Sequence, residues 1–215
     1  MQVTKYEHAA LVLDEGGRRL VIDPGGFTRS LGDVSAVDGI VITHEHPDHW
    51  TPAQLAALVA ANPSARVFGP AGVAAAVAAA DLGIDVDVVA DGDTRAVGPF
   101  SLRFAGTHHA LIHSSIPIID NTGVLVNGTL FHPGDSYTLP PVGGVVLAAP
   151  VGAPWLKISE AMDYVAAASP SKLFPIHEWT LSPTGLGMHL DRLRSMVEPA
   201  GAEVVTLAPG DTLDV

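Results

Sequence analysis

The chain has 215 residues, of which 47% are hydrophobic and 16% charged, and it carries a net charge of −12 and no cysteine. This composition excludes a disordered chain and suits a single domain over residues 1–215 with a sizeable core. The acidic balance excludes broad nucleic-acid or anionic-membrane binding, and the lack of cysteine excludes disulfides and thiolate metal ligands.

Strand patterns dominate the start of the chain. The alternation over residues 2–7 runs into the apolar stretch 9–13, and a second strand returns over 18–23 after a Glu-Gly-Gly turn. The β-branched run 39–43 predicts a buried strand, and Thr51 and Pro52 then predict the first residues of a helix.

Helix and strand patterns then alternate, which favours α/β crossovers. We expect helices over 51–61, 70–80, 157–168 and 187–197, with Ser159 as a cap of the third. The expected strands are 65–69, 85–90, 94–97, 100–106, 123–127, 129–132, 142–149, 172–176, 203–207 and 212–215. Asn127 and Gly128 indicate a two-residue hairpin. One domain with two sheets and outer helices follows.

The segment after strand 39–43 is the strongest chemical signal. It holds His44, His46, Asp48 and His49, and imidazole and carboxylate are ligands of zinc and similar divalent ions. Residues two apart on an extended segment point the same way, so His44 and His46 can converge on one ion. Asp48 and His49 follow a bend and can face a second ion. We interpret this segment as a metal-binding loop.

A third imidazole for the first ion is expected from the segment after strand 100–106. Three histidines compete there, and we favour His109, which precedes a small alanine, over His113 and then over His108.

Two later strand ends offer the remaining ligands. Asp135, in a Gly-Asp turn, can bridge two metals about 3.5–4 Å apart. His177 ends another β-type run and would complete the second site with Asp48 and His49. His132 is expected to lie in the core or to support the site by hydrogen bonds rather than to bind metal.

Other residues are expected near the centre without binding metal. Asp23 ends a strand and is predicted to orient the histidine loop by hydrogen bonds, and His8 to approach the site from the end of the first strand. His113 is a candidate for lining a substrate pocket, and His189 is expected at the surface or rim.

The order His44-x-His46-x-Asp48-His49, then His109, Asp135 and His177, resembles the metallo-β-lactamase-fold hydrolase superfamily. The opening hairpin ending in Ile22-Asp23-Pro24 also resembles that superfamily, and the run 106–113 and the later run 132–135 resemble its small single-domain members. These include the L-ascorbate-6-phosphate lactonase-like branch and uncharacterised metal-dependent hydrolases.

The resemblance implies a four-layer αββα sandwich of the α/β class with two divalent metals at one edge of its sheets. It assigns the ligands to three groups: His44, His46 and His109 on one metal, Asp48, His49 and His177 on the other, and Asp135 as the bridge. Zinc is the expected metal, with manganese or iron as alternatives.

The expected function is a cytoplasmic metal-dependent hydrolase. Water activated by two metals would attack a small-molecule ester, lactone or phosphorylated substrate, and Asp48 could accept its proton. A phosphodiesterase or nuclease is the alternative enzyme, and a non-catalytic metal-binding interaction protein is the alternative of another class. His46 argues against the diiron oxygen-reducing members, which resemble this motif but have a carboxylate there. No nucleic acid or membrane partner is expected, whereas a homo-oligomer is a common outcome.

Overall fold

The computed structural model describes residues 1–215 and contains two seven-stranded sheets. The first has the order β14-β1-β2-β3-β4-β5-β6, and the second the order β13-β12-β11-β10-β9-β8-β7. The strands of the first are β1 (Gln2–Lys5), β2 (Leu11–Glu15), β3 (Arg18–Ile22), β4 (Val37–Val41), β5 (Arg66–Gly69), β6 (Val86–Val88) and β14 (Thr212–Asp214). Those of the second are β7 (Thr94–Val97), β8 (Phe100–Ala105), β9 (Gly123–Val126), β10 (Leu130–His132), β11 (Val146–Pro150), β12 (Lys172–Ile176) and β13 (Glu203–Val204).

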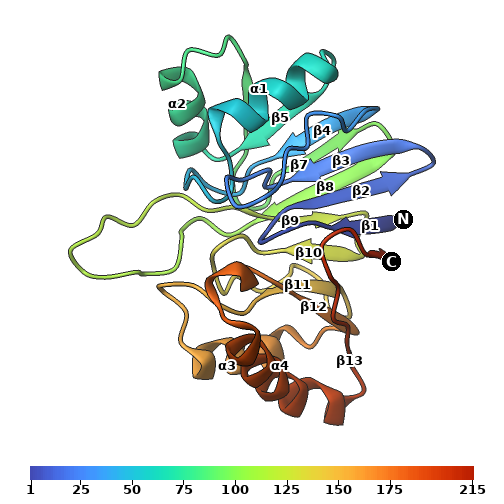
Figure 1. The fold of residues 1–215 in the computed structure, drawn as a ribbon, viewed down its shortest axis with the longest axis vertical. Coiled ribbons are helices and arrows are strands. Elements are labelled where there is room, and N and C mark those ends of the chain that lie inside the picture. Colours follow the sequence, from blue (N-terminus) through green and yellow to red (C-terminus); the bar gives the residue numbers. More distant parts are fainter.

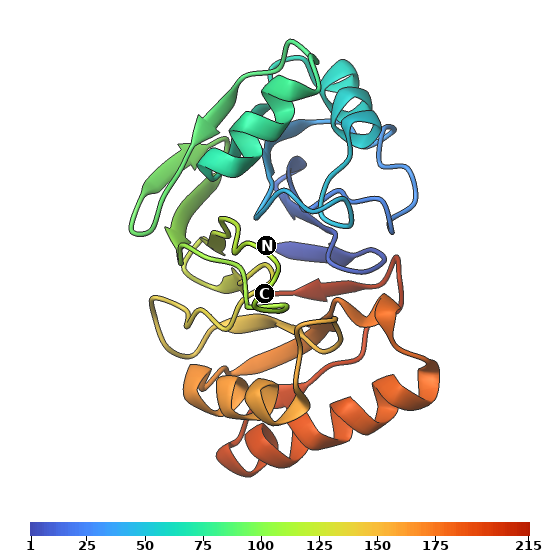
Figure 2. The same ribbon diagram turned by 90° about the vertical axis from the view of Figure 1, so that its left-hand side faces the viewer.

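Helices cover the outer face of each sheet (Figures 1 and 2). The first sheet carries α1 (Pro52–Ala61) and α2 (Ala71–Ala79), and the second carries α3 (Ile158–Ala168) and α4 (Pro183–Val197). Two short 3-10 helices, η1 (Glu178–Thr180) and η2 (Glu198–Ala200), flank α4. The layers therefore run helix, sheet, sheet, helix, and the predicted αββα sandwich is confirmed. No helix in the structure is long and apolar enough to cross a membrane.

Three apolar layers hold the sandwich together. Phe104 and Phe174 lie in the layer between the sheets. Leu55 of α1 belongs to the layer between the first sheet and its helices, and Val165 of α3 to the layer on the second sheet. The central strands have one face toward the other sheet and one toward the helices. Both faces are therefore buried, which explains why these strands are almost continuously apolar.

Local structure follows the predicted signals at several points. Thr51 caps α1 by accepting a hydrogen bond from the Gln54 N–H, and Pro52 is its first residue. Asn127 and Gly128, both at positive φ, close the β9–β10 hairpin.

Several predicted boundaries are wrong: the strand predicted over 142–149 begins only at Val146, and the one predicted over 203–207 ends at Val204. The first strand breaks at a tight turn, where His8 has a φ of 61°, and the chain reverses into β2. Helix α3 begins after Lys157 without a side-chain cap, so Ser159 is not its cap. Helix α4 begins at Pro183, four residues before the predicted start, because Ser182 caps it.

Strand direction brings the chemically important loops to one edge. Strands β3 and β4 are parallel to each other, as are β10, β11 and β12, so within each set the carboxyl ends lie at the same edge. Two antiparallel pairings separate β1 from β3 and β8 from β10, so β1 and β8 also end at that edge. A long arm, residues 107–122, leaves this edge between β8 and β9 (Figures 1 and 2).

Candidate metal centre

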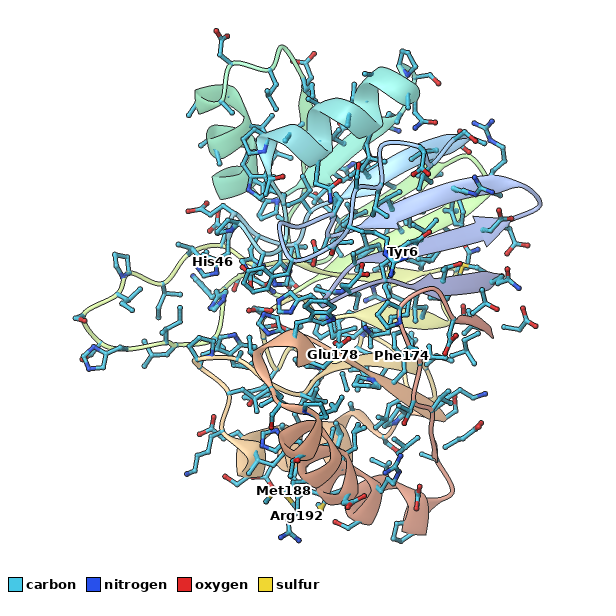
Figure 3. All side chains as sticks on the ribbon, in the orientation of Figure 1. Tyr6, His46, Phe174, Glu178, Met188 and Arg192 are labelled. Carbon is cyan, nitrogen blue, oxygen red and sulfur yellow. The ribbon has the colours of Figure 1, made fainter.

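The loops at this edge bring the predicted ligands together in three overlapping groups. Within each group, the donor atoms lie within 4.8 Å of one another. The groups are His44 with His46 and His109; His8 with Asp48, His49 and His177; and His44 with His49 and Asp135. The label of His46 in Figure 3 marks the place, close to where the arm leaves the body.

The first group contains three imidazoles. The ring centroids of His44 and His46 are 4.9 Å apart, and His109 lies 4.9 Å from His44 and 4.7 Å from His46. Two of the three come from the loop after β4 and one from the base of the arm. The first group is therefore complete only when the two sheets pack together.

The second group contains a carboxylate. The Asp48 Oδ2 atom lies 3.4 Å from Nε2 of His177 and 3.9 Å from Nε2 of His49. His8 joins this group, with its Nε2 3.1 Å from the same oxygen. The structure thus places His8 in contact with an expected ligand, as predicted, and near enough to count among the donors.

Asp135 lies between the two groups. Its Oδ2 is 3.4 Å from Nε2 of His109 and 3.0 Å from Nε2 of His177, and its Oδ1 is 3.1 Å from Nε2 of His49. One carboxylate thus faces one imidazole of the first group and two of the second.

The imidazoles present free nitrogens to the centre. In His44, His49, His109 and His177, the Nε2 atom is buried without a hydrogen-bond partner, as is Oδ1 of Asp135. Such atoms are costly unless a ligand satisfies them.

The Nδ1 atoms of the same rings are held in place. Those of His109 and His177 face the carbonyl oxygens of Ala110 and Gly152, so they must carry the proton. In the neutral ring, Nε2 is then unprotonated and carries a lone pair, and this tautomer can bind a divalent ion. These residues fit a metal by their chemistry.

Asp23 contacts residues of both groups. Its Oδ2 accepts hydrogen bonds from Nδ1 of His49 at 2.8 Å and from the Thr43 hydroxyl at 2.8 Å. The Thr43 oxygen in turn lies 3.0 Å from Nδ1 of His44. The two glycines after Pro24 let this strand end approach the loop, because a Cβ at Gly25 would lie 1.7 Å from the Asp48 carbonyl oxygen.

The two groups differ in their proton affinity. Burial lowers the pKa of His44 and of His46. Burial also opposes the charge of His49 and His177, but Asp135 outweighs it, and the pKa of His177 rises to about 9. Burial alone would raise the pKa of Asp48, yet its contacts with His177 and His8 hold that pKa well below the usual range.

Four other histidines lie outside the donor groups. His113 is exposed at the turn of the arm, where its Nδ1 faces the Ser115 hydroxyl at 2.7 Å, so the structure does not bring it to the centre. His108 is exposed beside Thr107. His132 is buried with both nitrogens hydrogen-bonded, as expected of a core histidine. His189 is half-buried on α4.

Sequence reasoning missed a buried ion pair. Lys5 of β1, fully buried, bonds to Glu178, the residue after His177 (Figure 3 labels Glu178). The backbone N–H of His177 also donates to the backbone carbonyl of His8 at 3.1 Å. The first strand thereby holds the loop that carries His177. The one signal in the sequence is that Lys5 alternates with the buried Val3 along β1, which puts both on the same face of the strand.

Comparison with known proteins places the chain in a family. The model of the β-lactamase superfamily domain matches residues 2–177, and the chain belongs to this family. Protein Rv0786c of Mycobacterium tuberculosis is 37% identical over 201 residues, covering 91% of this chain and 92% of its own.

Two further proteins show similarity. The UPF0173 metal-dependent hydrolase of Aeropyrum pernix is 27% identical over 210 residues, covering 83% of each chain. The structure of Igni18, a metallo hydrolase of Ignicoccus hospitalis, is 19% identical with a TM-score of 0.71, covering 99% of this chain and 97% of its own. That likeness establishes the fold.

Proposed function

We propose that this protein is a metal-dependent hydrolase with two divalent ions, zinc first and manganese or iron as alternatives. The observation that carries the proposal is the convergence of four buried, unpartnered Nε2 atoms around Asp135. The metal-dependent hydrolase among the relatives supports it. The assignment is His44, His46 and His109 for one ion, Asp48, His49 and His177 for the other, and Asp135 between them.

Two such ions would supply water acidified to near neutrality and would polarise the bond under attack. The protein's own residues hold that chemistry in place. His8 contacts the Asp48 carboxylate, and Asp23 fixes the ring of His49 directly and that of His44 through the Thr43 hydroxyl. We propose that Asp48, besides holding metal, would accept a proton from the water under activation, which is the role expected from the sequence.

A cavity beside the centre supports a small-molecule substrate. It has a volume of about 530 Å³, and the base of the arm, the loop after β10 and the start of α3 form its walls. Trp155 and Tyr137 supply aromatic surface, and Lys157 is its only lysine or arginine. A cavity of this size with few charges suits an ester, a lactone or a small phosphorylated compound.

The phosphodiesterase alternative has one observation in its favour. Lys157 lines the cavity together with Glu160, and its ammonium group could bind a phosphate or carboxylate group of a substrate. A nuclease would need more cations, because each phosphate contact along a chain requires one.

The test is a substrate panel on protein that has been depleted of metal and refilled with Zn²⁺, Mn²⁺ or Fe²⁺. Lactones, carboxylic esters, thioesters and phosphodiesters are compared under identical conditions. We expect turnover of a lactone or ester that a chelator abolishes and added metal restores. Faster turnover of a phosphodiester would favour the alternative enzyme, and tight metal binding without turnover of any compound would favour a non-catalytic protein.

A further inference from the structure

Trp155 lies on the loop between β11 and α3 and is 8% exposed. Its Nε1 atom is 2.8 Å from Oδ2 of Asp135. An indole nitrogen can only donate, so the carboxylate accepts, and a hydrogen bond to an ionised group is stronger than a neutral one.

The Asp135 main chain and side chain are held separately. Its N–H donates to Oδ1 of Asn121 at 2.9 Å, and its carbonyl accepts from the Ala110 N–H at 2.8 Å. Apart from the imidazoles of the centre, Trp155 is the one side chain that hydrogen-bonds the carboxylate. The orientation of that carboxylate about its side-chain bonds therefore depends on the indole.

The indole also spans both donor groups. Its ring centroid lies 6.0 Å from that of His109 and 6.4 Å from that of His177, edge to face in both cases. On another side it packs at 5.3 Å against Tyr137, which lines the same cavity. Trp155 is thus a shared wall between the cavity and the centre.

We infer that Trp155 is a positioning residue, whose indole N–H fixes the Asp135 carboxylate in the orientation that faces both donor groups. The inference rests on the proposed function, because it assigns Asp135 to the bridge between two ions. Loss of the N–H leaves the carboxylate free to rotate toward one group and away from the other. Partners outside a ligand set typically change metal affinity about 10- to 100-fold.

The first test is Trp155→Phe, which keeps an aromatic ring and removes the donor. Metal-depleted protein is titrated with Zn²⁺ in competition with a chromophoric chelator. We expect a 10- to 100-fold weaker affinity for at least one ion. The matched control is Tyr137→Phe, which removes a hydroxyl from the neighbouring ring and should bind Zn²⁺ as the wild type does. Wild-type affinity in the tryptophan variant would overturn the inference.

A double-mutant cycle separates positioning from packing. In the Asp135→Ala background, Trp155→Phe should cause no further loss of Zn²⁺ affinity, because the acceptor is already gone. A further loss as large as in the wild-type background would show that the ring acts by packing alone, which contradicts the inference.

A third measurement uses the native protein and does not depend on a variant that folds. The chain has three tryptophans, and the indole N–H of each gives one signal in a ¹⁵N–¹H spectrum. We expect the Trp155 signal to move as Zn²⁺ is added. An unmoved Trp155 signal at full occupancy would overturn the inference. Because every readout is Zn²⁺ binding, these results can hold even where no hydrolysis is found, and only the proposed function would then fail.

Discussion

The two donor groups of the centre lie side by side but differ in charge. The first is three imidazoles, and burial lowers the pKa of His44 and His46, so these rings are neutral near pH 7. The second contains Asp48 and faces Asp135, and the pKa of His177 rises to about 9. Without metal, the second group holds protons in the place of a cation. The first group is therefore ready to bind an ion, whereas the second must release a proton first.

Removal of one ligand from each group should give the largest effects. We expect His46→Ala to empty the first group and His177→Ala the second, so that each variant binds one Zn²⁺ ion where the wild type binds two. Hydrolysis should fall below detection in both, because the chemistry needs both ions. Metal analysis after dialysis, together with the assay, checks this. Full activity in either variant with one ion would show that one group alone suffices.

The second largest effect should be a difference between the two groups in how their Zn²⁺ affinity changes with pH. The pKa of His177 is raised from 6.5 to about 9, so its proton stabilises the metal-free fold below pH 6.5, and this stabilisation is lost as the pH rises through 9. Zn²⁺ must displace that proton. The affinity of the second group should therefore rise about tenfold per pH unit across this window for each proton displaced, with little change in the first.

Calorimetric titrations with Zn²⁺ at pH 6.5 and 8.5, in buffers of different ionisation enthalpy, count the protons released. Thermal unfolding of the metal-free protein should show a lower Tm at pH 9 than at pH 6.5. If the protein released equal numbers of protons on binding each Zn²⁺ ion, the proposed difference between the groups would be wrong.

The support beneath the histidine loop should give a smaller and more selective effect. Asp23 contacts both His49 and Thr43, whereas His44 is the only histidine ring that the Thr43 hydroxyl contacts. We expect Asp23→Asn to lower the affinity for both Zn²⁺ ions about 10- to 100-fold. Thr43→Val should lower the affinity of the first group alone. Asp38→Asn, which breaks a surface pair with Arg18, is the matched control. Equal weakening of both ions by Thr43→Val would contradict this division.

The sequence predicts the part of the centre that local patterns encode. His44, His46, Asp48 and His49 follow one apolar strand, and side-chain alternation and ligand chemistry are enough to interpret them. Asp135 and His177 follow from the same logic at other strand ends, because parallel strands finish at one edge. The Asn127-Gly128 hairpin is predicted for the same reason, since its turn depends on two adjacent residues.

What the sequence does not predict depends on contacts between distant segments. The turn at His8 carries no glycine, proline or asparagine, and a histidine takes the positive φ because tertiary contacts hold it there. The Lys5–Glu178 pair joins residues at opposite ends of the chain. Trp155 is only one aromatic residue near a motif until the fold places its N–H on Asp135.

Replacement of the exposed arm histidine, His113, should give the smallest effect of all. His109 is buried, with its Nδ1 on a backbone carbonyl and its Nε2 aimed at the centre, whereas His113 is exposed at the turn of the arm. We expect His113→Ala to bind both ions as the wild type does, because surface substitutions remote from a network change little. His109→Ala should lose the first ion, since two neutral imidazoles make a poor site for a divalent cation. Zn²⁺ titrations of this pair check the assignment, and loss of an ion in the His113 variant would mean that the arm folds back onto the centre when metal binds.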